Sequence, residues 1–203
     1  MVKRLQIKNL EFKFQLENIL FRHCRFEDIA QVMHVNRVTL PENYSRYTFL
    51  SLLRTYPDLF IVAVDENKDQ IIGYIMNKID TGYSFFDKSS AIIKKGHVFS
   101  IGVLPGYRKR GIATGLLGLA FNYMFKRSVS EIFLEVRVSN IPAIKLYEKF
   151  GMKKVDSIPY YYADGETAYV MAVKTTDVYD IAKKIVAYLI KIDRFNESIE
   201  EIE

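Results

Sequence analysis

A short basic stretch at positions 107–117 has the residue types of a phosphate-binding loop. It reads Tyr-Arg-Lys-Arg-Gly-Ile-Ala-Thr-Gly-Leu-Leu and lies between an alternating apolar segment at 97–104 and apolar residues at helical spacing. The first amides of a helix lack an intrahelical partner and carry the positive end of the helix dipole. Gly111 has no side chain at the point where phosphates would approach the backbone, and three basic residues precede it. Together these features predict a pyrophosphate site.

The loop alone does not decide its own role. Short glycine patterns are weak evidence, because an ordinary exposed loop with basic side chains ahead of a helix has the same composition. Both interpretations stay open until the neighbouring elements are considered.

The composition is that of a folded, moderately basic protein. The chain has 203 residues, 49% hydrophobic and 14% aromatic, which is enough for the core of one domain. Its net charge of +5 suits an anionic cofactor, a ribosomal surface or nucleic acid and distinguishes none of them. The single cysteine, Cys24, excludes an internal disulfide framework. No secretory signal and no membrane-spanning apolar run is visible, so we expect a cytoplasmic protein without a membrane partner.

The hydrophobic patterning predicts a mixed α/β domain. Alternation predicts strands at 19–25, 59–64, 71–79, 97–104, 131–138, 153–156 and 169–174, and a further strand or extended arm at 10–16. Helical spacing predicts helices near 26–39, 49–56, 112–124, 140–150 and 176–192. We expect a loop at 81–96 and an N-cap at Thr176 and Asp177.

These elements predict one domain with two appended segments. The domain covers 19–175, after an N-terminal extension at 1–18 and before a C-terminal helical extension at 176–203. The final helix is amphipathic, so we expect it to pack on the domain or on a second copy of it.

Six motifs stand in a fixed order along the chain. They are Leu-Pro-Glu-Asn-Tyr at 40–44, Gly-His-Val at 96–98, the basic loop at 108–113, Leu-Glu-Val-Arg-Val-Ser-Asn at 134–140, Ala-x-x-Leu-Tyr at 143–147 and Tyr-Tyr-Ala-Asp-Gly-Glu at 161–166. Together they resemble the GNAT acyltransferase superfamily, and within it the N-terminal protein acetyltransferases of archaea and of the NatA catalytic subunit. The loop at 108–113 matches that family's Gln/Arg-x-x-Gly-x-Gly/Ala pattern. The resemblance spans about residues 25–173.

The resemblance implies a GNAT fold, whose mixed central sheet is flanked by helices and splays between the fourth and fifth core strands, and acetyl-CoA as cofactor in the gap. The residues that it assigns to acetyl-CoA are Ile101, Gly102 and Val103 for the pantetheine arm, Arg108, Lys109, Arg110, Gly111, Ile112, Ala113 and Thr114 for the pyrophosphate, and Asn140 and Tyr147 beyond the neighbouring strand.

The resemblance also implies direct attack of a protein's α-amino group on the thioester. Glu42 and His97 are the candidate bases, acting through ordered water, and Tyr147 is the candidate proton donor to the departing thiolate. Their alternatives are a structural strand histidine and a core tyrosine. Because no covalent enzyme intermediate is needed, Cys24 is better interpreted as a core residue than as a nucleophile.

The peptide groove and a metal site complete the predicted residues. The resemblance places six side chains in the groove: Leu40, Tyr44, Tyr47, Arg137, Tyr161 and Tyr162. The alternative for the tyrosines is a place in the aromatic core, and the alternative for the arginine is an ion pair with a carboxylate. His97 and Glu135 are expected to face each other on neighbouring strands. Two ligands make a poor zinc site, so a metal is possible but not required.

The function that follows is N-α-acetylation of protein N-termini of the Ser, Ala, Thr or Met type. The alternatives are a ribosomal-protein-specific N-acetyltransferase and a non-catalytic acetyl-CoA sensor. Protein or peptide N-termini are the expected partners, and association with the ribosome is a further possibility. The basic residues form no recognisable RNA-binding motif, so no specific nucleic-acid partner is expected.

Overall fold

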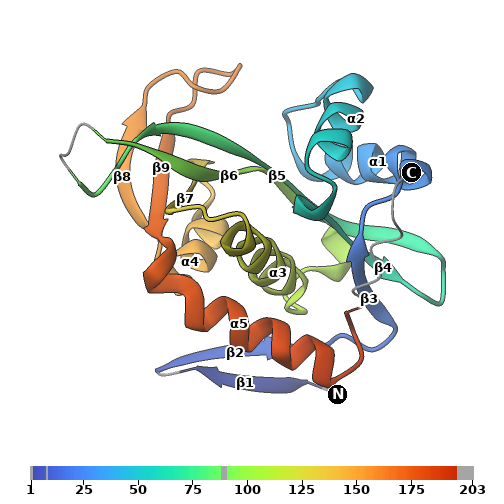
Figure 1. Cartoon of the computed structure of the whole chain (residues 1–203). Coiled ribbons are helices and arrows are strands. Elements are labelled where there is room, and N and C mark those ends of the chain that lie inside the picture. The colour runs from blue at the N-terminus through green and yellow to red at the C-terminus, as the bar shows by residue number, and fades with distance from the viewer. Residues whose placement is uncertain (1, 8, 88–90, 196–203) are drawn as a thin grey trace.

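The computed structural model describes residues 2–7, 9–87 and 91–195, and its centre is a seven-stranded sheet of order β3-β4-β5-β6-β7-β9-β8 (Figure 1). These strands are β3 Ile19–His23, β4 Phe60–Asp65, β5 Gln70–Tyr83, β6 Ile92–Val103, β7 Glu131–Arg137, β8 Lys153–Ile158 and β9 Ala168–Lys174. All neighbouring strands are antiparallel except β6 and β7, which are parallel. A separate two-stranded sheet pairs β1 Lys3–Ile7 with β2 Leu10–Phe14.

Helices cover both faces of the large sheet. They are α1 Ile29–Thr39, α2 Arg46–Thr55, α3 Ile112–Lys126, α4 Ile141–Lys149 and α5 Thr175–Lys191, with short 3₁₀ turns at Phe26–Asp28, Pro57–Leu59 and Pro105–Tyr107. α1 contacts β5 and β6 from one face, and α3 contacts β4, β5 and β6 from the other. In the described part of the chain, no helix combines the length and the apolar character needed to cross a membrane.

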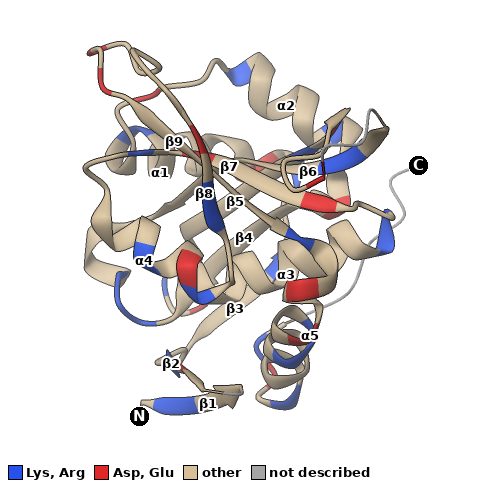
Figure 2. Cartoon of the chain, turned by 90° about the vertical axis from the view of Figure 1, so that its left-hand side faces the viewer, with Lys and Arg blue, Asp and Glu red and all other residues tan. Residues whose placement is uncertain are grey.

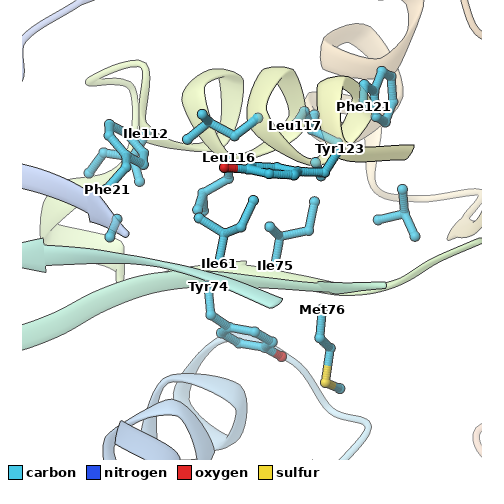
Figure 3. Packing of buried hydrophobic residues seen from close by; sticks show 14 of the residues in the cluster. Phe21, Ile61, Tyr74, Ile75, Met76, Ile112, Leu116, Leu117, Phe121 and Tyr123 are labelled. Atoms are coloured by element: carbon cyan, nitrogen blue, oxygen red, sulfur yellow. The ribbon is translucent and has the colours of Figure 1, made fainter. Parts of the chain in front are cut away.

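The two-sided cover explains the sequence of the central strands. All six residues of β4 are buried, because a strand between two helical layers has no solvent face. On β5, successive side chains point to opposite faces, so Ile75 packs towards α3 whereas Tyr74 and Met76 point away from it (Figure 3). The element order and the mixed sheet confirm the fold class predicted from the sequence.

The sheet opens between β6 and β7. Their parallel pairing covers only Lys95 to His97 against Glu131 to Phe133. Directly beyond it, the register of β6 against β5 shifts, with Ser100 opposite Met76 and Val98 opposite Asn77. Phe99 is therefore an extra residue, and such a bulge bends its strand. From this point the two strands separate, as the resemblance predicts for the fourth and fifth core strands.

The expected loop at 81–96 is wrong at both of its ends, where 81–83 and 92–96 belong to strands, and residues 88–90 lie outside the described part of the chain. β5 continues to Tyr83 and β6 already begins at Ile92, so the two strands form a long hairpin arm. The sequence hides this because Lys94 and Lys95 interrupt the apolar alternation. Lys95 is nevertheless buried, and its Nζ donates to the Tyr83 carbonyl at 3.0 Å and lies 3.5 Å from the centre of the Phe85 ring. A cation–π contact thus replaces the expected aliphatic side chain.

Two smaller differences concern element ends. β3 stops at His23, so Cys24 follows the first core strand instead of lying in it, although it is buried as expected. α5 begins at Thr175 with Lys174 as N-cap, two to three residues before the predicted cap. Thr175 Oγ1 donates to the Ser130 carbonyl at 2.9 Å, so a contact with the turn between α3 and β7 sets the helix start.

Both terminal segments share the hydrophobic core of the domain. β2 confirms the strand expected at 10–16, and its partner β1 was not predicted. One continuous cluster of buried residues includes Phe12 and Phe14 of β2, Leu117 of α3 and Leu189 of α5. Figure 1 shows β2 running beneath α5, so the two extensions lie side by side.

The close packing of α5 on α3 leads to a stability prediction. A Cβ at Gly118 would lie 2.5 Å from Ile185 Cγ2. An unhindered Gly→Ala change in a helix gains about 1 kcal/mol. Here we expect Gly118→Ala to lower the free energy of unfolding by about 1–3 kcal/mol, because overpacking forces the helices apart. Urea denaturation measures the change.

Ile185→Ala provides the control. It removes Cγ2, the atom nearest to the new Cβ, and keeps the Ile185 Cβ at 2.9 Å, so the clash is relieved in part and the double variant should be more stable than the sum of the two single changes predicts. A stabilising effect of Gly118→Ala alone would contradict the packing.

Candidate active site

A cavity of about 690 Å³ lies where β6 and β7 separate. Its side walls are the two strand ends, with Val98 to Val103 on β6 and Leu134 to Arg137 on β7. The first turns of α3 and α4 and the loop after α1 complete it. This shape can receive an extended ligand between the strands, because backbone groups at an unpaired strand edge are available for hydrogen bonds.

One end of the cavity is the predicted phosphate loop. Arg108 and Lys109 line it, together with the start of α3 at Ile112, Ala113 and Thr114. Lys109 and Gly111 have positive φ, 62° and 90°. Left-handed residues directly before a helix turn successive amides towards one side, an arrangement that binds anions. The residues at this end therefore fit a pyrophosphate.

Tyr107 ties this loop to the sheet. Its hydroxyl donates to Asp65 Oδ2 at 2.7 Å and accepts from Lys68 Nζ at 2.8 Å. Asp65 is the last residue of β4 and Lys68 lies in the turn that follows, so these contacts fix the start of the phosphate loop.

Two predicted loop residues have partners outside the cavity. Arg110 is not among the lining residues, and its Nε donates to the Gln15 carbonyl at 3.2 Å. A Cβ at Gly111 would lie 2.5 Å from the Lys13 carbonyl oxygen, so the missing side chain leaves room for the N-terminal hairpin. From the sequence alone, we expected the missing side chain of Gly111 to make room for phosphates.

The opposite wall carries Asn140 and Tyr147. Asn140 caps α4, since its Oδ1 accepts from the Ala143 N–H at 3.3 Å, and it also lines the cavity. Tyr147 lies two turns further along the helix. Burial raises the pKa of its phenol above the usual value, so the group keeps its proton at neutral pH and can act as a donor.

His97 and Glu135 face each other as expected, joined by a hydrogen bond of 2.7 Å between His97 Nε2 and Glu135 Oε2. His97 Nδ1 is 3.3 Å from Asp80 Oδ2, and the ring stacks on Phe133 at 4.3 Å. Only Glu135 lines the cavity, so His97 lies behind it. Among the described residues, no group of three or more His, Cys, Asp or Glu side chains is arranged to hold a metal ion.

Arg137, at the end of β7, binds three carboxylates. Nη2 donates to Glu42 Oε1 at 2.5 Å, and Nη1 donates to Asp164 at 2.8 Å and to Glu166 at 2.6 Å. Burial lowers the pKa of Arg137, but these hydrogen bonds outweigh it and keep the pKa above its usual value. Because Glu42 follows α1 and the other two carboxylates precede β9, Arg137 joins the loops on both sides of the cavity mouth.

Three of the four predicted groove tyrosines surround this mouth. Tyr44, Tyr161 and Tyr162 line the cavity, and Arg137 Cζ lies 4.0 Å from the centre of the Tyr162 ring. Burial, and after it the charge of Glu135, raises the pKa of Tyr161 to about 12. Tyr47 is 78% exposed on α2 and lies outside the cavity wall.

The structure therefore brings most of the predicted site residues to one cavity. Three candidates do not line it: His97, Arg110 and Tyr47. Sequence reasoning missed the clamp of Asp164 and Glu166 on Arg137, although both acids stand in a quoted motif around Gly165. It also missed Ser100, which lines the cavity and bonds the Tyr74 hydroxyl at 2.7 Å.

A comparison with known families agrees with the fold and the cavity. The profile of the acetyltransferase (GNAT) family matches residues 29–152, more than half of the chain. The chain therefore belongs to the GNAT acetyltransferase family.

Within that family, the chain is similar to enzymes named for N-terminal acetylation. It is 49% identical over 152 residues to an N-alpha-acetyltransferase of Saccharolobus solfataricus, covering 74% of this chain and 90% of that one. It is 33% identical over 185 residues to an N-terminal acetyltransferase complex ARD1 subunit homolog of Dictyostelium discoideum, covering 90% and 86%. Arabidopsis thaliana Naa50, solved with the bisubstrate analogue CoA-Ac-MVNAL, has a TM-score of 0.65 at 25% identity and covers 77% of this chain and 98% of that chain.

The Arg137 cluster leads to a prediction about pH. A hydrogen bond from the Glu166 N–H, and then one from Arg137, lowers the pKa of Asp164. Hydrogen bonds from Ser139, and then from Arg137, lower the pKa of Glu166. A lowered folded-state pKa stabilises the protein above the unfolded value of about 4, and this stability is lost as the pH falls through the folded value. Arg137→Gln should therefore reduce Tm at pH 7 and reduce it less at pH 3.

Thermal melts from pH 3 to pH 7 make the measurement. Arg127→Gln is the control, because Arg127 pairs with the single carboxylate of Asp58 and should give the smaller deficit at pH 7. An Arg137→Gln deficit that is equal at both pH values would contradict the cluster.

Proposed function

We propose that this chain is an N-α-acetyltransferase that transfers the acetyl group of acetyl-CoA to the free α-amino group of protein N-termini. The observation that carries the proposal is the cavity between β6 and β7. It runs from a basic helix N-terminus to carboxylates and tyrosines at its other end. The similarity to enzymes named N-alpha-acetyltransferase supports the same activity.

The donor end holds acetyl-CoA by contacts of three kinds. Arg108, Lys109 and the first amides of α3 bind the pyrophosphate. Backbone groups at Ile101 to Val103 hold the pantetheine arm in the place of a neighbouring strand, and Asn140 bonds it from the other side. The thioester supplies an acyl group that an amine can attack directly.

The acceptor end binds and deprotonates an α-amino group. Its reference pKa of about 7.7–8.0 leaves a minority neutral at pH 7, so the base has less to do than it would for lysine at about 10.4. Glu42 and Glu135 border the cavity, and His97 is bonded to Glu135. Water at the two carboxylates passes the amine proton to Glu42, or through Glu135 to His97.

The first residues of the substrate bind at the cavity mouth, which is lined by Leu40, Tyr44, Tyr161 and Tyr162. The hydroxyl of Tyr147 donates to the sulfur as the carbon–sulfur bond breaks. Substrates of the Ser, Ala, Thr and Met type, a cytoplasmic site of action and association with ribosomes stay predictions.

Acetylation of short peptides tests the proposal. We expect acetyl-CoA and peptides beginning Ser-Leu, Ala-Leu or Met-Leu to yield products heavier by one acetyl group on the α-nitrogen. Mass spectrometry with fragmentation locates the group. The same peptides with a blocked N-terminus and an internal lysine are the controls and should stay unmodified.

Other results would assign another function. Turnover only with the N-terminus of a ribosomal protein would indicate the ribosomal-protein-specific alternative. Tight binding of acetyl-CoA without turnover on any peptide would indicate a sensor.

Tyr147 leads to a separate kinetic prediction. Tyr147→Phe removes the proton donor and keeps the ring, so kcat should fall about 10²-fold while the KM of the peptide changes little. Tyr123→Phe is the control, because Tyr123 is a similarly buried tyrosine on α3, outside the cavity. Equal kcat values for both variants would show that Tyr147 does not donate the proton to the sulfur.

A further inference from the structure

The N-terminal hairpin of β1 and β2 contacts the phosphate loop directly. It precedes residues 29–152, which match the GNAT family, so the family match assigns it no role. Figure 2 shows the hairpin at the base of the molecule, next to α5. Residues just after β2 continue from this hairpin to the back of the loop.

One backbone hydrogen bond and one side-chain hydrogen bond join the two segments. The Gln15 N–H donates to the Arg110 carbonyl at 2.8 Å. In return, Arg110 Nε donates to the Gln15 carbonyl at 3.2 Å, which turns this guanidinium towards the hairpin. The loop therefore has a strand-like partner on the side that faces away from the cavity.

Side-chain packing closes the same contact. A Cβ at Gly111 would lie 2.5 Å from the Lys13 carbonyl oxygen and 2.7 Å from Phe14 Cδ1. The left-handed φ of 90° at Gly111 belongs to this arrangement, because it allows the loop to lie flat on β2 while α3 starts at the next residue.

The hairpin is itself held by two helices. Phe12 and Phe14 lie on one face of β2 and are 2% and 1% exposed. Phe14 packs on Tyr188 of α5, with ring centres 5.0 Å apart. Phe12 packs on Phe150, directly after α4, at 5.8 Å. The surface behind the phosphate loop is therefore a fixed part of the core.

From these contacts we infer that the N-terminal hairpin is part of the acetyl-CoA site and positions the pyrophosphate loop through Lys13, Phe14 and Gln15. These are positioning residues, because they touch the loop and not the ligand. A loop of exposed basic residues loses conformational freedom when it binds a phosphate, and a loop that is already held loses less. The inference rests on the proposed donor, acetyl-CoA.

Two matched Phe→Leu substitutions test this role. Phe14→Leu withdraws ring atoms from Gly111, and we expect the Kd of CoA to rise about tenfold. Phe60→Leu is the control, because Phe60 is an equally buried phenylalanine on β4, outside the hairpin and the cavity wall, and its Kd should equal that of the unchanged chain. Gln15→Pro is a third variant, at an exposed position outside the core. It removes the N–H that donates to the Arg110 carbonyl, so it should weaken the binding of CoA to a similar extent.

A truncated donor separates loop positioning from general damage. S-acetyl-pantetheine lacks the pyrophosphate, so kcat/KM with this donor should be unchanged by Phe14→Leu and by Gln15→Pro, whereas kcat/KM with acetyl-CoA falls. Calorimetry with CoA on the full chain gives the Kd, and it needs no turnover.

The outcomes distinguish the two proposals. Weaker CoA binding in both loop-facing variants, without peptide acetylation by the unchanged chain, supports the hairpin role and rejects the proposed enzyme. An unchanged Kd in Phe14→Leu and Gln15→Pro overturns the hairpin role, and so does an equal loss with both donors or an equal loss in Phe60→Leu.

Discussion

The structure depends on one interruption in the hydrogen bonding of its sheet. β6 and β7 pair over three residues and then separate at the bulge of Phe99. Helices cover both faces of the sheet, so the opening becomes a walled cavity instead of an exposed edge. Unpaired backbone groups in a core are costly unless a ligand or water satisfies them. A ligand that is itself extended and polar along its length is the natural occupant, and this constraint connects the fold to acyl transfer from acetyl-CoA.

Opposite charges at the two ends of the cavity give it a direction. The start of α3, with Arg108 and Lys109, is suited to phosphates. The other end holds Glu42 and Glu135, and Arg137, which also lines this end, is bound to three carboxylates. An anionic donor and a cationic amine therefore approach from different ends. Tyr147, on the wall between them, keeps its proton because burial raises its pKa.

Two segments outside the family match, the N-terminal hairpin and α5, lie together. α5 packs on α3, and the hairpin packs on α5, on the end of α4 and on the phosphate loop. The helices that border the cavity are thus supported from behind by segments outside the family match. Close packing of this kind transmits small displacements, because protein interiors have few voids to absorb them. The extensions therefore belong with the domain in any account of how the donor is held.

The sequence by itself determined the order of the elements in the large sheet and its helices, the GNAT class and most of the cavity residues, because these follow from local periodicity and from contiguous motifs such as 108–113. It did not determine which partner each side chain selects. Arg110 turns to Gln15, 95 positions away, and Glu135 stands between His97 and the cavity. Lys95 is buried against Phe85, which concealed the β5–β6 arm. These contacts join segments that are distant in the chain, so only the tertiary structure decides them, through the geometry in which the strands and loops meet.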